Sequence, residues 1–218
     1  MVKGLDTFQK YFADYEEQYV LIGGAACDIL FESNEVNFRA TRDLDMVLIV
    51  EALTPEFGEK FWKFIVDGKY RNKATNGSNP QFYRFNKPED DNFPKMIELF
   101  CRSDFKLKNA KGITPIHIDD EVSSLSAILL NDDYYKALLN GKEVRNGLSV
   151  LRPEYIILFK AKAYLDLKKR KYLGEKVDSS DIKKHKKDIL RIASELMLEI
   201  VEELPIAVDA DIHSFIDL

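Results

Sequence analysis

The chain has 218 residues, of which 45% are hydrophobic and 11% aromatic, and its formal net charge at pH 7 is -5. This length allows one large domain or a domain with an appendage, and the apolar content excludes an intrinsically disordered chain. A net charge of this size does not by itself indicate a nucleic-acid or membrane partner.

Cysteine usage and hydropathy indicate a location. The two cysteines, Cys27 and Cys101, are too few for a disulfide framework and lack metal-ligand spacing. The first residues contain acids and no apolar core of the signal-peptide type. The most apolar run, Tyr19 to Phe31, is too short to cross a bilayer and contains Asp28. We therefore expect a cytoplasmic protein without a membrane partner.

Periodicity in the first half predicts helices and strands together. The expected elements are a helix over about 5–18, a strand over 19–22, a helix over 25–31, a strand over 44–50 and a helix over about 55–68. Gly23-Gly24 separates the first strand from the second helix, and Thr54 followed by Pro55 is typical of a helix start. The pattern is that of an α+β protein.

The middle of the chain predicts a hairpin and then a mixed stretch. The expected elements are strands over 81–85 and 95–102, a strand over 126–130, a helix over 132–140 and a strand over 144–151. The first two strands, joined by a polar turn, would pair as an antiparallel hairpin. Gly141, just past the expected helix, is typical of a helix end.

The character of the sequence changes at Arg152, after which it is rich in helix formers and lysine. We place a domain boundary there, with a core over 1–150 and a helical domain over 151–218. The expected helices cover 153–172, about 180–203 and part of 207–218, with Asp178 or Ser179 as the cap of the second and Pro205 as its end.

Two aspartates are placed to bind a divalent cation together. Asp43 and Asp45 are two residues apart on an expected strand and so share one face. Glycines before a helix let a phosphate approach the backbone N–H groups at its positive end, and Gly23-Gly24 occupies that position. An acidic turn without a function is the alternative.

A third carboxylate, Glu98, lies between Ile97 and Leu99 in an apolar strand. Burying it is costly unless it binds a cation or a donor, although it could instead face solvent. Asp43, Asp45 and Glu98 on neighbouring strands would form a site for Mg²⁺ or Mn²⁺, hard ions that take oxygen ligands and substrate phosphates.

These motifs resemble a known family. The glycine pair, the stretch Thr41-Arg42-Asp43-Leu44-Asp45 and Glu98 are similar to the DNA polymerase beta-type nucleotidyltransferase superfamily, and within it most similar to the AbiEii/AbiGii abortive-infection toxin family. The eighteen residues between Gly24 and Asp43 exceed the superfamily's usual gap and suit the toxin-like branch better. KAKAYLDLKKRK and SSDIKKHKKDI correspond to its later helices, with Lys160, Arg170 and Asp188 in matching places.

The resemblance implies a nucleotidyltransferase fold, with a mixed sheet flanked by helices and a helical domain closing over the nucleotide. It implies transfer of an NMP from an NTP, with Asp43, Asp45 and Glu98 as catalytic residues and metal ligands. Glu98 could instead be the general base. The nucleotide-binding residues would be Gly23, Gly24, Thr41, Lys160 and Asp188, with Lys162 as the rival of Lys160.

The partners follow from the same interpretation. Residues 160–191 contain twelve Lys or Arg against five Asp or Glu, which is either a solvated helix face or a surface for an RNA acceptor such as tRNA. A toxin-like role implies a possible antitoxin protein. The alternatives are a non-catalytic nucleotide-binding or interaction module and a transferase that modifies a small-molecule antibiotic.

Overall fold

The chain divides into two compact units. The computed structural model describes residues 2–32, 43–71, 84–101, 128–129, 131–201 and 203–218. One unit comprises Met1–Asp120 with Glu143–Val150, and the other comprises Glu121–Lys142 with Leu151–Leu218. Residues 121–142 thus group with the second unit, although the composition of the chain changes only after Val150.

A mixed sheet forms the first unit. Its strands are β1 (Tyr19–Ile22), β2 (Asp43–Leu48), β3 (Arg84–Asn86), β4 (Met96–Phe100), β5 (Lys142–Arg145) and β6 (Leu148–Leu151), in the order β3-β4-β2-β1-β6-β5. β2 pairs parallel to β4 and antiparallel to β1, and β3 pairs antiparallel to β4. The predicted α+β class with a mixed sheet is confirmed, as is the predicted hairpin.

Helices occur in both units. They are α1 (Leu5–Phe12), α2 (Gly23–Glu32), α3 (Pro55–Asp67), α5 (Asp132–Asn140), α6 (Pro153–Tyr172), α7 (Ser179–Glu195) and α8 (Ile206–Ile216), with short 3-10 turns η1 (Glu16–Gln18) and η2 (Val50–Ala52). None of the described helices combines the length and the apolar character needed to cross a membrane.

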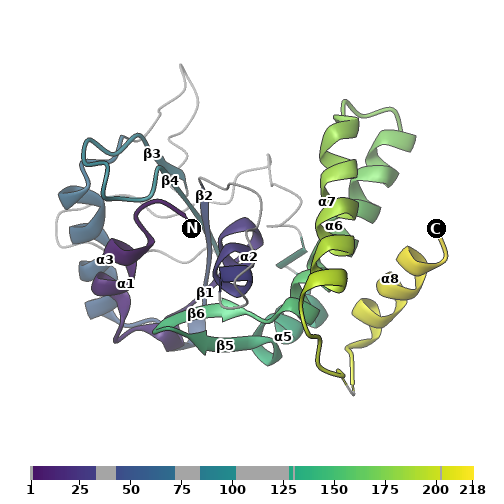
Figure 1. The fold of residues 1–218 in the computed structure, drawn as a ribbon, viewed down its shortest axis with the longest axis horizontal. Helices are drawn as coiled ribbons and strands as arrows, with labels where there is room; N and C mark the ends of the chain where they lie inside the picture. Colours follow the sequence, from purple (N-terminus) through teal and green to yellow (C-terminus); the bar gives the residue numbers. More distant parts are fainter. Residues whose placement is uncertain (1, 33–42, 72–83, 102–127, 130, 202) are drawn as a thin grey trace. The chain divides into compact units, whose positions relative to one another are not determined.

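An aromatic core covers one face of the sheet. Phe8 and Phe12 of α1 contact Tyr19 of β1, with ring centroids 5.4 and 6.3 Å away. Phe61 of α3 meets Phe85 of β3 edge-on at 5.5 Å. All five side chains are buried. Such pairs add to the free energy gained from apolar burial, so α1 and α3 are fixed on this face, and Figure 1 shows α2 on the other.

Local capping sets the start of α3 as predicted. The Thr54 hydroxyl accepts a hydrogen bond from the Phe57 amide at 3.3 Å, and Pro55 occupies the first turn. Pro lacks an N–H and has a fixed φ, so it costs nothing there. The helix ends at Asp67, with Gly68 as its cap.

Three of the elements predicted within residues 1–151 are wrong in part. The first helix ends at Phe12 instead of about residue 18. The stretch over 144–151 is two strands joined at Asn146 and Gly147, whose φ values of 51° and 67° suit a tight hairpin turn. Ile128 and Leu129, predicted in a strand, are helical. A short apolar run cannot distinguish these two states by periodicity.

Helix α7 ends at Glu195, well before the predicted stop at Pro205. The chain turns because it is tied to the start of α6. The Glu199 amide donates to the buried Glu154 carboxylate at 2.5 Å, and the Glu199 side chain pairs with Arg152 at 2.9 Å. Pro205 instead precedes α8, which confirms the predicted final helix. The predicted bounds of α6 and the Asp178 cap of α7 are also confirmed.

Candidate functional site

One face of the sheet carries the predicted acids at adjacent positions of β2 and β4. In the parallel pair of β2 and β4, Asp43 is opposite Met96 and Asp45 is opposite Glu98. Residues opposite each other in adjacent strands share a face, so Asp45 and Glu98 are in-register neighbours. Asp43, Asp45 and Glu98 are all half-buried. Their neighbours Leu44 and Ile97 point into the core.

The glycine pair lies against this face. Gly23 is the first residue of α2 and has a φ of 63°, a conformation that side chains disfavour. A Cβ at Gly23 would collide with the Asp45 carboxylate. Gly23 is therefore required both for its conformation and for the close approach of its backbone to Asp45. Gly24 follows within the helix and is buried.

The chemistry of the three acids suits a metal ion, but the arrangement of their side chains does not. Carboxylate oxygens suit Mg²⁺ or Mn²⁺, so Asp43, Asp45 and Glu98 fit such an ion chemically. Among the residues that the structure describes, however, no three His, Cys, Asp or Glu side chains form a group that could hold a metal. The Glu98 carboxylate is instead paired with Arg84, whose Nη2 lies 2.5 Å from Oε1.

The second unit brings Lys160 and Asp188 together. Lys160 of α6 donates to Asp188 Oδ2 of α7 at 2.7 Å, and both residues are buried. A buried ammonium requires an anion, and Asp188 supplies it. The family resemblance implied that both residues bind the nucleotide, and their pairing with each other was not predicted.

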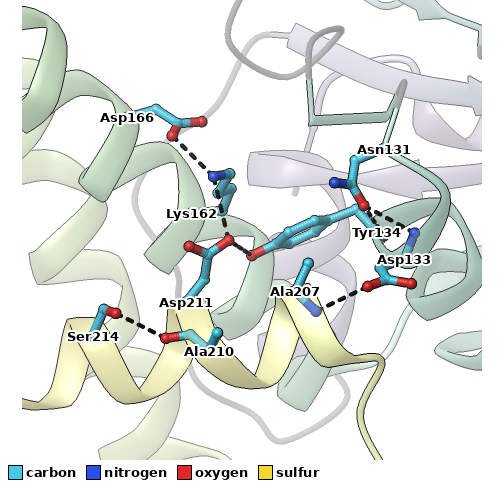
Figure 2. A network of polar contacts seen from close by, with 9 residues as sticks. All are labelled: Asn131, Asp133, Tyr134, Lys162, Asp166, Ala207, Ala210, Asp211 and Ser214. Atoms are coloured by element: carbon cyan, nitrogen blue, oxygen red, sulfur yellow. Dashed lines mark hydrogen bonds and ion pairs between the residues drawn. The ribbon is translucent and has the colours of Figure 1, made fainter.

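Lys162 is also paired within this unit, as Figure 2 shows. Its Nζ lies 3.1 Å from Asp166 Oδ1 and 3.3 Å from Asp211 Oδ2. Burial lowers the pKa of Lys162, but the hydrogen bonds and charges of the two aspartates outweigh it, so that the pKa lies above its ordinary value. Lys162 is a charged group with two carboxylate partners, and a phosphate would compete with both.

Sequence reasoning missed the residues that complete this network. The Tyr134 hydroxyl of α5 donates to Asp211 Oδ2 at 3.0 Å, and burial together with the charge of Asp211 raises the pKa of Tyr134 well above its usual range. Asp133 accepts a hydrogen bond from the Ala207 amide at 2.8 Å. Asp133 thereby caps α8 from another helix (Figure 2). The only feature of the sequence that could have indicated this network is the pair of acids in the first turn of α5.

Thr41, a predicted phosphate donor, lies outside the described residues. The lysines of the predicted RNA surface are exposed on α6 and α7: Lys168, Lys169, Lys171, Lys183, Lys184, Lys186 and Lys187. Arg170 is also exposed, and its Nε pairs with Glu175 at 2.6 Å.

No protein-family model matches the chain, and no curated protein matches its sequence. The resemblance to the nucleotidyltransferases therefore stays a prediction, carried by the residues described above.

Proposed function

We propose that this chain is a metal-dependent nucleotidyltransferase that moves an NMP from an NTP to an acceptor. The observation that supports it is the in-register placement of Asp45 and Glu98 on one face of the sheet, beside the glycine that opens α2. A mixed sheet with helices on both faces is also what the resemblance to the DNA polymerase beta-type superfamily predicts.

The proposed roles follow from position. Asp43 and Asp45 bind the ion, and Glu98 serves as a third ligand or as the base that accepts the proton of the acceptor hydroxyl. Backbone N–H groups at the start of α2, beside Gly24, bind phosphate oxygens. A bound Mg²⁺ would neutralise phosphate charge and stabilise the leaving pyrophosphate.

The acceptor that fits the surface best is an RNA. Exposed lysines on α7 supply positive charge, which binds phosphate backbones without sequence preference. A toxin-like transferase would also be neutralised by a partner protein in the same cell. Expression of the chain would then impair growth, and Asp45→Asn would relieve that effect.

The decisive experiment measures transfer of label from each of the four NTPs, with Mg²⁺, to total RNA. Asp45→Asn should abolish transfer and leave thermal unfolding close to that of the wild type. The matched control is Asp91→Asn, which changes an exposed acid that pairs with Lys3 at 3.2 Å. Wild-type activity in Asp45→Asn, or the absence of any nucleotide binding, would overturn the proposal.

The Arg84 ion pair favours a second candidate, a non-catalytic nucleotide-binding module. Arg84 neutralises the third acid, as expected of a chain that keeps the fold without turnover. Such a protein would bind an NTP tightly and release it unchanged. Nucleotide binding without label transfer, unaffected by Glu98→Gln, would favour this candidate over the enzyme.

A further inference from the structure

Glu98 has a positively charged neighbour on one side and an acid on the other. In the sheet, Glu98 of β4 is opposite Arg84 of β3 and opposite Asp45 of β2. Adjacent strands lie about 4.8 Å apart, so both neighbours are within reach of its carboxylate. The Glu98 side chain can therefore turn towards a cation beside Asp45 or towards the guanidinium of Arg84.

In the structure it is bound to Arg84. Both Nε and Nη2 of Arg84 lie 2.5 Å from Glu98 Oε1. The Glu98 side chain is 16% exposed and that of Arg84 is 43% exposed. This is a charge-assisted contact from two donors to one oxygen, between a half-buried carboxylate and an exposed guanidinium.

We propose that Arg84 competes with the metal ion for Glu98 and thereby holds the third ligand away from the aspartates. This inference rests on the proposed nucleotidyltransferase function. An equilibrium in which Glu98 binds either Arg84 or the ion is reciprocal: each partner lowers the affinity for the other. Arg84 also offsets the repulsion between Asp45 and Glu98 while no ion is bound.

The competition explains why the acids that the sequence predicts as metal ligands are not arranged as a metal site in the structure. The three acids have the right chemistry and the right strand positions, yet their carboxylates do not form a metal-binding group in the described residues. An ion that recruits Glu98 must first displace the guanidinium. Arg84 is thus a positioning residue that sets the affinity for the ion, without contacting the ion itself.

The test is a titration of the full chain with Mn²⁺ in the absence of nucleotide, in which free Mn²⁺ is followed by electron paramagnetic resonance. Arg84→Gln and Arg84→Ala should lower the Kd for Mn²⁺ about three- to fivefold, because a competing ion pair is removed. In Arg84→Gln/Glu98→Gln this tightening should disappear, because no carboxylate is released.

The matched control is Arg71→Ala. Arg71 is bridged to Asn86 of β3, and its side chain lies 4.0 Å from Glu89 instead of Glu98. This variant removes the same charge close to the same strand, so general electrostatics would tighten Mn²⁺ binding in both variants. An unchanged Kd in both Arg84 variants, or an equal tightening in Arg71→Ala, would overturn the inference.

The outcomes separate this inference from the proposed function. Loss of Mn²⁺ binding in Asp45→Asn supports the metal site whatever Arg84 does. Mn²⁺ binding that appears only in the Arg84 variants supports the competition directly. If neither the wild type nor any variant binds Mn²⁺, both the metal site and the competition are wrong.

Discussion

Lys160 and Asp188 form the most deeply buried ion pair that the structure describes, with side chains 9% and 6% exposed. Removing one partner of a buried pair leaves an uncompensated charge, which costs about 3–5 kcal/mol. Asp188→Ala should lower the free energy of unfolding by that amount in urea denaturation. Lys160→Met/Asp188→Leu should be destabilised much less, because neither charge remains.

The control is Lys183→Ala, which removes an exposed lysine of the same helix as Asp188. Exposed substitutions usually change stability by less than about 0.5 kcal/mol. A destabilisation in Asp188→Ala no larger than that in Lys183→Ala would contradict a structural role for the pair.

Tyr11 makes a pH-dependent contact with Asp67. The hydrogen bond to Asp67, burial and the charge of Asp67 raise the pKa of Tyr11 to about 12 from 10.0. The raised pKa stabilises the folded state below pH 10.0, and this contribution disappears as the pH rises through about 12. Asp67→Asn should return the Tyr11 titration towards 10.0.

The titration is measured as tyrosinate absorbance, with Tyr11→Phe subtracted to isolate this residue among the ten tyrosines. Lys63→Met is the control, because Lys63 pairs with Asp67 at 2.6 Å but has no described hydrogen bond to Tyr11. An unchanged titration in Asp67→Asn would mean that burial alone raises the pKa of Tyr11.

At the scale of elements, the sequence predicted the features that depend only on residues close together in the chain. The bounds of α6 follow from Pro153 and periodicity, and the Thr54 cap fixes the start of α3. The shared face of Asp43 and Asp45 follows from the period of a strand. The early end of α7 depends on contacts with Glu154 and Arg152, which no local pattern contains.

The candidate site was likewise predictable from the sequence only in part. Alternation along one strand predicts which residues share a face, but the neighbour across the sheet depends on strand order and register. The sequence could therefore propose Glu98 as a third acid, while its contact with Arg84 was out of reach. The partners of Lys160 and Lys162 were missed for the same reason, since they come from other helices.

Helix α8 is held at its start by a cap from another helix. Asp133 of α5 accepts the Ala207 amide, and Pro205 and Ile206 offer no capping side chain of their own. Asp133→Ala should destabilise α8 by about 1 kcal/mol, the usual value of a cap. Amide exchange over Ile206–Ile216 should then become faster while that of α3 stays the same.

Asp133→Asn is the matched variant, because it keeps an acceptor oxygen and removes only the charge. Exchange in α8 should remain close to that of the wild type. If Asp133→Asn accelerates exchange as much as Asp133→Ala, the charge at the helix start is responsible and the cap is not. Unchanged exchange in Asp133→Ala would mean that the buried Val208 and the contacts of Asp211 with Tyr134 and Lys162 hold α8 without the cap.

At the scale of the molecule, charge is unevenly distributed: the basic residues concentrate in 160–191, while the whole chain is acidic. Lys183, Lys184, Lys186 and Lys187 are all exposed on α7. If they bind an RNA backbone, each neutralised phosphate releases a counterion, and the salt slope of the affinity scales with the number of such phosphates. Replacing all four by glutamine should weaken RNA binding and reduce the slope by about 0.7 for each phosphate that is no longer neutralised.

The control for this prediction replaces four exposed lysines elsewhere, Lys10, Lys87, Lys95 and Lys136, by glutamine. Both variants change the net charge equally, so long-range attraction falls by a similar amount in each. Only the removal of lysines that touch the RNA backbone lowers the salt slope, which is measured by fluorescence anisotropy of a labelled RNA over a range of salt concentrations. An equal slope in the two variants would identify the basic run as a solvated helix face, and the acceptor would then have to be bound by other parts of the chain.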